Sequence, residues 1–323
     1  MSADGAIEID PQALRELELL DASLQEIESE IMAKKCIQQA PVLIQRQQTI
    51  DKIPGFWAVV FDNAAVELEA AITAQDSEIL ANALVRLEVL RPEIPAGASH
   101  TDSGLDKFGE PRTITINFHF KENEWFTDSV LSKTLYFRHS LDGSTGLVSD
   151  PIKINWKPGK DLTEGLTDAA YELWAAQKQL PSQQLDGVLN QEARKARDLE
   201  AKSLPQYKNL EKTIEEKING ALSFFNFFSY RGRWTSAAEN AEALAKTRAR
   251  RAAALAGKPV EDEEDDDDDF DFAEEAVESF PPGHEVAVTI AEDIWPDAID
   301  YFLADSIDSD VDIDDEDDDV EME

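Results

Sequence analysis

The sequence contains a single cysteine, Cys36, among its 323 residues. One cysteine excludes an intrachain disulfide and a zinc site built from several thiolates. The four histidines lack the i, i+4 spacing of a helical metal site, and neither a phosphate-binding glycine loop nor a G-x-S-x-G turn is present. The sequence therefore predicts no metal, no cofactor and no catalytic centre, and we expect a protein that is not an enzyme.

Long apolar runs are also missing. No apolar stretch approaches the ~18 residues that a membrane-spanning helix needs. The first ten residues lack the basic and apolar parts of a signal peptide. We therefore expect no membrane association and an intracellular, reducing environment.

Lysine and arginine are absent from the last 63 residues, which hold 30 of the 68 acidic residues of the chain. Most of the formal net charge of −38 therefore lies in this C-terminal part. Glu261 to Asp269 are nine consecutive acids, and residues 308–323 form a second acidic block. Like-charged blocks of this kind stay disordered and repel phosphate. This excludes direct nucleic acid binding by the tail and predicts a strongly cationic partner.

The chain begins with the pattern of a long amphipathic helix over residues 11–55. Asp10-Pro11 is typical of a helix start and Ile53-Pro54-Gly55 of a helix end, while Pro41 should introduce a kink. A helix of this length would extend roughly 65 Å. Its apolar stripe could fold onto its own domain or onto a second copy, and the length favours a symmetric homodimer. The predicted dimerisation residues are Leu14, Leu17, Leu20, Leu24, Ile27 and Ile31.

The middle of the chain has the period of an antiparallel sheet between helices. Apolar and polar residues alternate over Arg112–Lys121, and Asp142-Gly143 is typical of a hairpin turn. Lys133–Arg138 and Ile152–Trp156 are predicted to be further strands. The helical segments expected around this sheet are Trp57–Ala71, Asp76–Leu90 (with Leu87–Leu90 open to an extended structure), 166–218, a buried helix over 221–230, Ala237–Ala256, and a folded segment over Val286–Leu303.

Four cations lie near the end of the helix expected over Ala237–Ala256. They could complement the partial negative charge of the helix C-terminus. Basic clusters of this size are also typical of nuclear import signals, and the sequence leaves both interpretations open. The residues are Lys246, Arg248, Arg250 and Arg251.

Six motifs, in this order along the chain, resemble the nucleosome assembly protein family. The later motifs narrow the resemblance to the SET (template-activating factor) branch and its fungal relatives. The motifs are Ile53-Pro-Gly-Phe-Trp57, Phe118-His-Phe-Lys-Glu-Asn123, Leu131-Ser-Lys133, Trp156-Lys-Pro-Gly-Lys-Asp-Leu162, Ser223-Phe-Phe225 and Asp293-Ile-Trp-Pro296.

The resemblance implies an α+β fold with a dimerisation helix over 11–55 and an "earmuff" domain over 56–307. In that domain a short antiparallel sheet of about four strands packs under helices. The chain departs from the family pattern by a helical insertion at 167–218 and an acidic loop insertion at 231–285. Residues 1–10 and the acidic tail 308–323 are expected to be disordered.

The resemblance also implies a nuclear histone chaperone, with shuttling to the cytoplasm left open. A homodimer would bind core histones through an acidic concave surface and the tail, shield them from nonspecific DNA contacts, and promote nucleosome assembly and disassembly. The alternative is a regulatory cofactor of a histone acetyltransferase, or a phosphatase inhibitor. The expected histone-binding residues are acids that flank the last motif, although solvated surface is the alternative for each: Glu292, Asp293, Asp297, Asp300 and Asp305.

Overall fold

The computed structural model describes residues 11–68, 71–180, 187–188, 191–217, 222–256 and 277–311. The predictions of disorder for 1–10 and for most of the tail, and the acidic block 261–269, lie outside the described residues.

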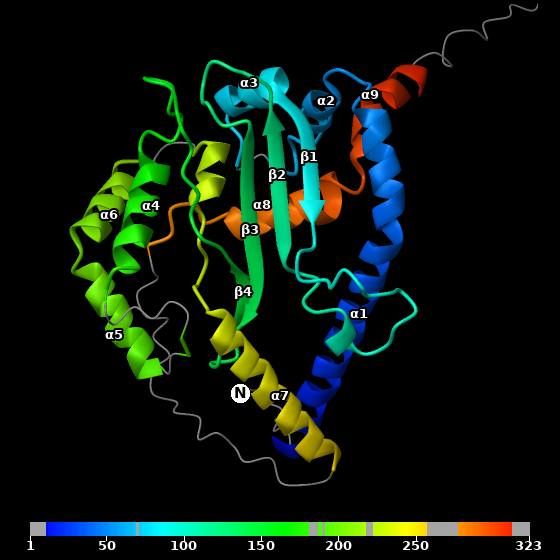
Figure 1. Ribbon diagram of the computed structural model, residues 1–323, viewed down its shortest axis with the longest axis vertical. Coiled ribbons are helices and arrows are strands. Elements are labelled where there is room, and N and C mark those ends of the chain that lie inside the picture. The colour runs from blue at the N-terminus through cyan, green and yellow to red at the C-terminus, as the bar shows by residue number, and fades with distance from the viewer. Residues whose placement is uncertain are drawn as a thin grey trace, which may run out of the picture.

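The first element is the long helix α1 (Pro11–Ile50), which runs along one side of the molecule (Figure 1). It contains 40 residues and continues through Pro41 as one helix. It ends five residues before the sequence pattern indicates. The reason is a tighter turn, in which the Ile53 amide bonds to the Ile50 carbonyl at 2.8 Å and Gly55 adopts a φ of 76°.

Four antiparallel strands form one sheet in the order β1-β2-β3-β4. On β2 the residues Ile114, Ile116, Phe118 and Phe120 are buried, as the alternation predicts. The number of strands confirms the predicted fold class. The strands are β1 (Leu84–Leu90), β2 (Ile114–Phe120), β3 (Val130–His139) and β4 (Thr145–Val148).

The strand predicted over Ile152–Trp156 is wrong. The Ile152 amide donates to the carbonyl of Phe228, outside the sheet, and only Trp156 forms an isolated bridge, with Phe126. The fourth strand is instead β4, which follows the predicted Asp142-Gly143 turn. In this turn the Asp142 carboxylate accepts a hydrogen bond from the Ser144 amide at 2.9 Å, and Gly143 has a φ of 84°.

The helix predicted over Asp76–Leu90 is also too long. Helix α3 (Ala74–Ala83) ends where β1 begins. A register shift between Leu84 and Arg86 places both Leu84 and Leu87 in the core, so their spacing of three imitates a helical pattern. Helix α2 (Phe56–Asn63) is likewise shorter than the predicted Trp57–Ala71.

One face of the sheet carries the main core. The buried 3₁₀ helix η2 (Phe224–Ser229) supplies four fully buried phenylalanines, two of which lie 5.7 Å from the ring of Phe118. Behind the sheet in Figure 1 lies α8 (Gly283–Val288), which leads through the π-helical segment η3 (Thr289–Ile294) to α9 (Ala298–Val311). Because α9 reaches Val311, the first residues of the segment predicted to be disordered from 308 are helical.

Three helices of the predicted insertion stand beside the sheet, at the left of Figure 1. Their small second core includes Leu173 of α4 and Tyr207 and Leu210 of α6. A fourth helix, α7, leaves the β3–β4 end of the domain and runs toward the N-terminal half of α1 (Figure 1). The bounds are α4 (Leu166–Gln177), α5 (Gln191–Lys202), α6 (Pro205–Lys217) and α7 (Ala237–Leu255), and a short 3₁₀ turn, η1 (Leu105–Lys107), lies against α1.

A buried lysine joins β3 to the aromatic segment. Lys133 is fully buried, and its Nζ donates hydrogen bonds to the carbonyls of Asp150 at 2.8 Å, Phe228 at 3.0 Å and Tyr230 at 2.7 Å. The three N–H groups of an ammonium match these three acceptors. Lys133 therefore fixes the position of η2 on the sheet.

Candidate functional site

An exposed apolar stripe runs along α1. At about 100° per residue, its members from Leu17 to Val42 fall within a sector of about 80°. The opposite side of the helix faces the domain, where Ser29 and Ala33 are 5% and 0% exposed. Leu14 lies at the border of the stripe, and Ile44 lies well outside it. The stripe consists of Leu17, Leu20, Leu24, Ile27, Ile31 and Val42, whose side chains are 56–63% exposed.

Polar contacts hold α1 to the domain at three places along its length. Near its C-terminus, Arg46 donates to the carbonyl of Pro296 at 2.8 Å and stacks over the Trp295 ring. In the middle, the Glu30 carboxylate accepts from the amide of Gly104 at 2.9 Å. Toward the N-terminus, Glu26 forms an ion pair with Arg251 of α7. The stripe is therefore held away from the domain and is open to a second molecule.

The predicted histone-binding acids lie on η3 and α9, and the structure divides them. Asp293, Asp297 and Asp300 are exposed. Glu292 is instead partly buried and forms an ion pair with Arg91, 201 residues away. Asp305 lies on α9, but its side chain falls outside the described residues.

Two of these acids, Asp293 and Asp297, lie near Tyr301 together with Glu67, a carboxylate that the sequence did not single out. The Tyr301 hydroxyl donates to Glu67 at 3.1 Å. Partial burial together with the neighbouring Glu67, Asp293 and Asp297 raises the pKa of Tyr301 to about 12. Glu67 follows α2, outside the matched motifs, and only the packing of α2 on α9 brings it into this group.

On the face of the sheet that does not carry the main core, the described carboxylates pair with basic side chains. Glu88 contacts Arg86 at 2.5 Å and His119 at 3.0 Å. Arg138 pairs with Glu93 at 2.9 Å. Carboxylates without such partners are found instead on η3 and α9, so the sheet face contributes little to an acidic surface.

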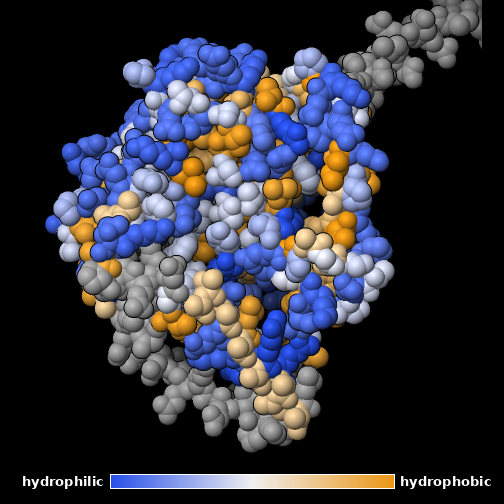
Figure 2. All heavy atoms as spheres, in the orientation of Figure 1, coloured by the Kyte–Doolittle hydropathy of each residue, from blue (hydrophilic) through white to orange (hydrophobic). Residues whose placement is uncertain are grey.

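The four cations that the sequence suggests as an import signal lie on helix α7. Lys246, Arg248 and Arg250 are exposed, whereas Arg251 pairs with Glu26. Figure 2 shows the alanine-rich helix as a pale ridge across the lower part of the molecule. Its first turn is firmly anchored, because buried Glu239 accepts hydrogen bonds from Arg194 at 2.5 Å and from the Ser140 hydroxyl at 2.8 Å.

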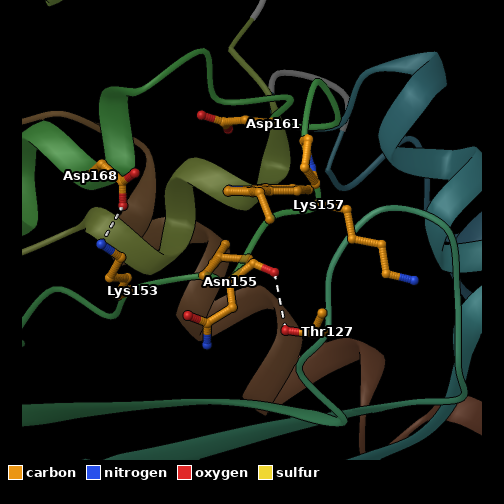
Figure 3. Close-up of a pocket in the computed structure, with 9 residues that line it drawn as sticks. Thr127, Lys153, Asn155, Lys157, Asp161 and Asp168 are labelled. Atoms are coloured by element: carbon orange, nitrogen blue, oxygen red, sulfur yellow. Dashed lines mark hydrogen bonds and ion pairs between the residues drawn. The ribbon is translucent and has the colours of Figure 1, made fainter.

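A hollow of about 360 Å³ lies between the loops that follow β2 and β4 (Figure 3). In it, Lys153 points toward Asp168 at 3.7 Å, and the Thr127 hydroxyl donates to the Asn155 carbonyl at 3.4 Å. Its lining contains no cysteine, serine or histidine. The charged side chains that line the hollow are of both signs and are partly paired with one another.

The described part of the chain contains neither a metal-ligating cluster nor a membrane-spanning helix. No three histidine, cysteine, aspartate or glutamate side chains within it are arranged to hold a metal ion. Likewise, none of the described helices has the length and apolarity to cross a bilayer.

Comparison with known proteins identifies relatives of this chain. The family model described as "Nucleosome assembly protein (NAP)" matches residues 15–305. The Arabidopsis thaliana NAP1-related protein 1 is 33% identical over 137 residues, which are 42% of this chain and 45% of that protein. Human nucleosome assembly protein 1-like 1 is 30% identical over 119 residues, 34% of this chain and 26% of that protein. These curated relatives therefore extend well beyond the parts that match.

Among solved structures, the crystal structure of Vps75 has a similar fold. It superposes with a TM-score of 0.52 and covers 92% of this chain and 100% of its own, at 17% sequence identity. At that identity the likeness concerns the fold alone. The match includes the long helix and the sheet together, in agreement with the predicted architecture.

Proposed function

Because the chain belongs to the nucleosome assembly protein family, we propose that it is a histone chaperone that acts as a homodimer. The observation that carries this proposal is the family match over residues 15–305, which spans α1, the sheet and α9 in one unit. In this role the protein binds core histones, limits their nonspecific contacts with DNA, and promotes nucleosome assembly and disassembly.

The proposed mechanism is competition between carboxylates and phosphates for histone lysines and arginines. The chain carries 68 acidic residues, 30 of them after residue 260. Attraction by such a polyanion decays over about 8 Å at physiological salt. The folded domain must therefore supply specificity, since a polyanion attracts almost any cationic partner. No catalytic step is part of the mechanism.

The proposed histone contacts of the folded domain are Asp293, Asp297 and Asp300, with Asp305 next to them on α9. Glu292 would have to release Arg91 to join them, so it is the weakest of the five predicted acids.

The test is a charge-reversal variant, Asp293→Lys/Asp297→Lys/Asp300→Lys, titrated with folded core histones. A matched control reverses three exposed acids elsewhere, Glu78, Glu122 and Glu172, and so changes the net charge equally. Clear weakening by the first variant, with a much smaller effect of the control, supports this contact surface. Equal effects of the two variants would mean that total charge alone governs binding.

The proposed location is the nucleus, with α7 supplying the import signal. Exposure of Lys246, Arg248 and Arg250 supports this reading. Replacing the three by alanine should abolish nuclear accumulation of a fluorescent fusion. Replacing three exposed lysines of α5 and α6, namely Lys195, Lys208 and Lys212, should leave it unchanged.

A second candidate function is regulation of a histone-modifying enzyme such as an acetyltransferase, or inhibition of a phosphatase. It is favoured by the separate core of α4 and α6 and by Leu199 of α5, which is 67% exposed. Leu199→Glu would then reduce stimulation of the acetyltransferase without altering histone affinity. Unchanged stimulation would count against docking at these helices.

A further inference from the structure

Helix α7 is held at its N-terminal end by a buried polar cluster. Glu239 is 1% exposed, and its carboxylate accepts hydrogen bonds from Arg194 of α5 at 2.5 Å and from the Ser140 hydroxyl at 2.8 Å. The neighbouring Asn240 side chain accepts from the His139 amide at 2.7 Å. Displacing a buried ion pair is costly, because each charge would lose its partner in a low-dielectric site. The start of α7 therefore has a fixed position on α5 and on the turn between β3 and β4.

The rest of α7 leaves the domain and crosses to α1. All residues from Ala245 to Arg250 are exposed, so this part of the helix is not packed against the domain. At Arg251 the helix meets α1, and the guanidinium forms an ion pair with Glu26, 225 residues away. Figure 1 shows this crossing at the lower end of the molecule. Helix α7 is thus anchored at its start and attached near its end, with an exposed stretch between.

The attachment lies on the N-terminal half of α1 and away from the stripe. At about 100° per residue, Glu26 is roughly 140° around the helix from the centre of the stripe. Among the described side chains, its pair with Arg251 is the polar contact of α1 with another element that lies nearest the N-terminus of α1, and the contact of Glu30 with Gly104 is the next. The stripe members within residues 17–24 precede both contacts, so their direction depends on them.

We propose that α5, the turn at residues 139–141 and α7 form a brace, which fixes the angle between the domain and the N-terminal half of α1. The inference rests on the proposed homodimer, because that half of α1 carries four of the six stripe residues. A preset helix direction lowers the ordering cost of association. The brace also gives a shared role to the two segments in which the chain departs from the family pattern, 167–218 and 231–285.

The two ends of the brace differ in strength. The side chains of Arg251 and Glu26 are 27% and 39% exposed. An exposed ion pair shifts an equilibrium by up to about fivefold, and a symmetric dimer contains two such pairs. Those of Arg194 and Glu239 are 10% and 1% exposed, so salt screens this pair much less. The brace should therefore open at its α1 end and stay closed at its α5 end.

The test uses the full chain at about 0.05 and 0.5 M salt. Arg251→Gln removes the attachment to α1. The matched control, Arg248→Gln, makes the same change in charge at an exposed position of the same helix. A third variant, Glu26→Arg/Arg251→Glu, exchanges the two charges and should restore the contact. Sedimentation equilibrium gives the dimer Kd, and hydrogen exchange gives the protection of the amides in residues 245–255.

At the lower salt we expect Arg251→Gln to raise the dimer Kd at least about twofold over the control and to speed the exchange of these amides. The charge exchange should reverse both effects, and the higher salt should remove the difference between Arg251→Gln and the control. Equal Kd values for Arg251→Gln and the control, with or without a change in exchange, would overturn the brace and leave the homodimer intact. An unmodified chain that sediments as a monomer would instead refute the proposed homodimer, and this inference with it.

Discussion

Replacing Ile31 by alanine should weaken the proposed homodimer without unfolding the subunit. Ile31 lies in the middle of the α1 stripe and is 59% exposed in one subunit. Full burial of an isoleucine side chain contributes about 1.5–3 kcal/mol. A partner would bury only the part of Ile31 that is exposed in one subunit, so its replacement by alanine should cost about 1 kcal/mol of association free energy. Two-fold symmetry applies this loss twice, for a total of about 2 kcal/mol or an approximately 30-fold rise in the dimer Kd.

Ile44 provides a matched control for this prediction. It is on the same helix and is 62% exposed, but it lies well outside the sector of the stripe. Ile44→Ala makes the same chemical change and the same small gain in helix propensity. Sedimentation equilibrium over a range of concentrations should show a weaker dimer only for Ile31→Ala. Equal dimer Kd values for the two variants would refute the assignment of the stripe as the dimer interface.

Three further predictions concern the stability of the domain, each measured by urea unfolding. Glu239→Gln should destabilise it by about 3 kcal/mol, because a buried arginine loses its ionic partner; a change below 1 kcal/mol would contradict the anchoring of α7. Burial raises the pKa of Glu110, but His139 and Arg112 outweigh this and lower it to about 2. The native state therefore loses up to about 3 kcal/mol between pH 4.5 and 2, and Glu110→Gln should lack this loss. Lys133→Met should cost about 3 kcal/mol, because three buried carbonyls lose their donor; wild-type stability would argue against that role.

Local patterns predicted the elements whose burial follows a simple period. On β2 the alternation of Ile114 to Phe120 is direct, because one side of the strand is buried under helices. On β1 the irregularity between Leu84 and Arg86 changed the spacing of inward residues from two to three, and the sequence then resembled a helix. A bulge depends on pairing with a neighbouring strand, which a local pattern does not contain.

For the candidate site too, the sequence predicted what depends on one helix and missed what depends on tertiary contacts. The α1 stripe is a property of one helix, so five of its six predicted members share one face. The pairing of Glu292 with Arg91 and the approach of Glu67 to Tyr301 join residues more than 200 positions apart. Such contacts follow from tertiary packing, and they changed which acids are free to bind a partner.

The central claim is that the folded domain, besides the acidic tail, binds core histones. The most direct measurement is a fluorescence titration of folded core histones with a chain that ends after Val311, where α9 ends, beside the full-length chain. At ~0.3 M salt the screening length is about 6 Å, so long-range attraction by the tail is reduced. The account predicts that the shortened chain binds within about tenfold of the full chain. Loss of detectable binding by the shortened chain, while the full chain still binds, would contradict it.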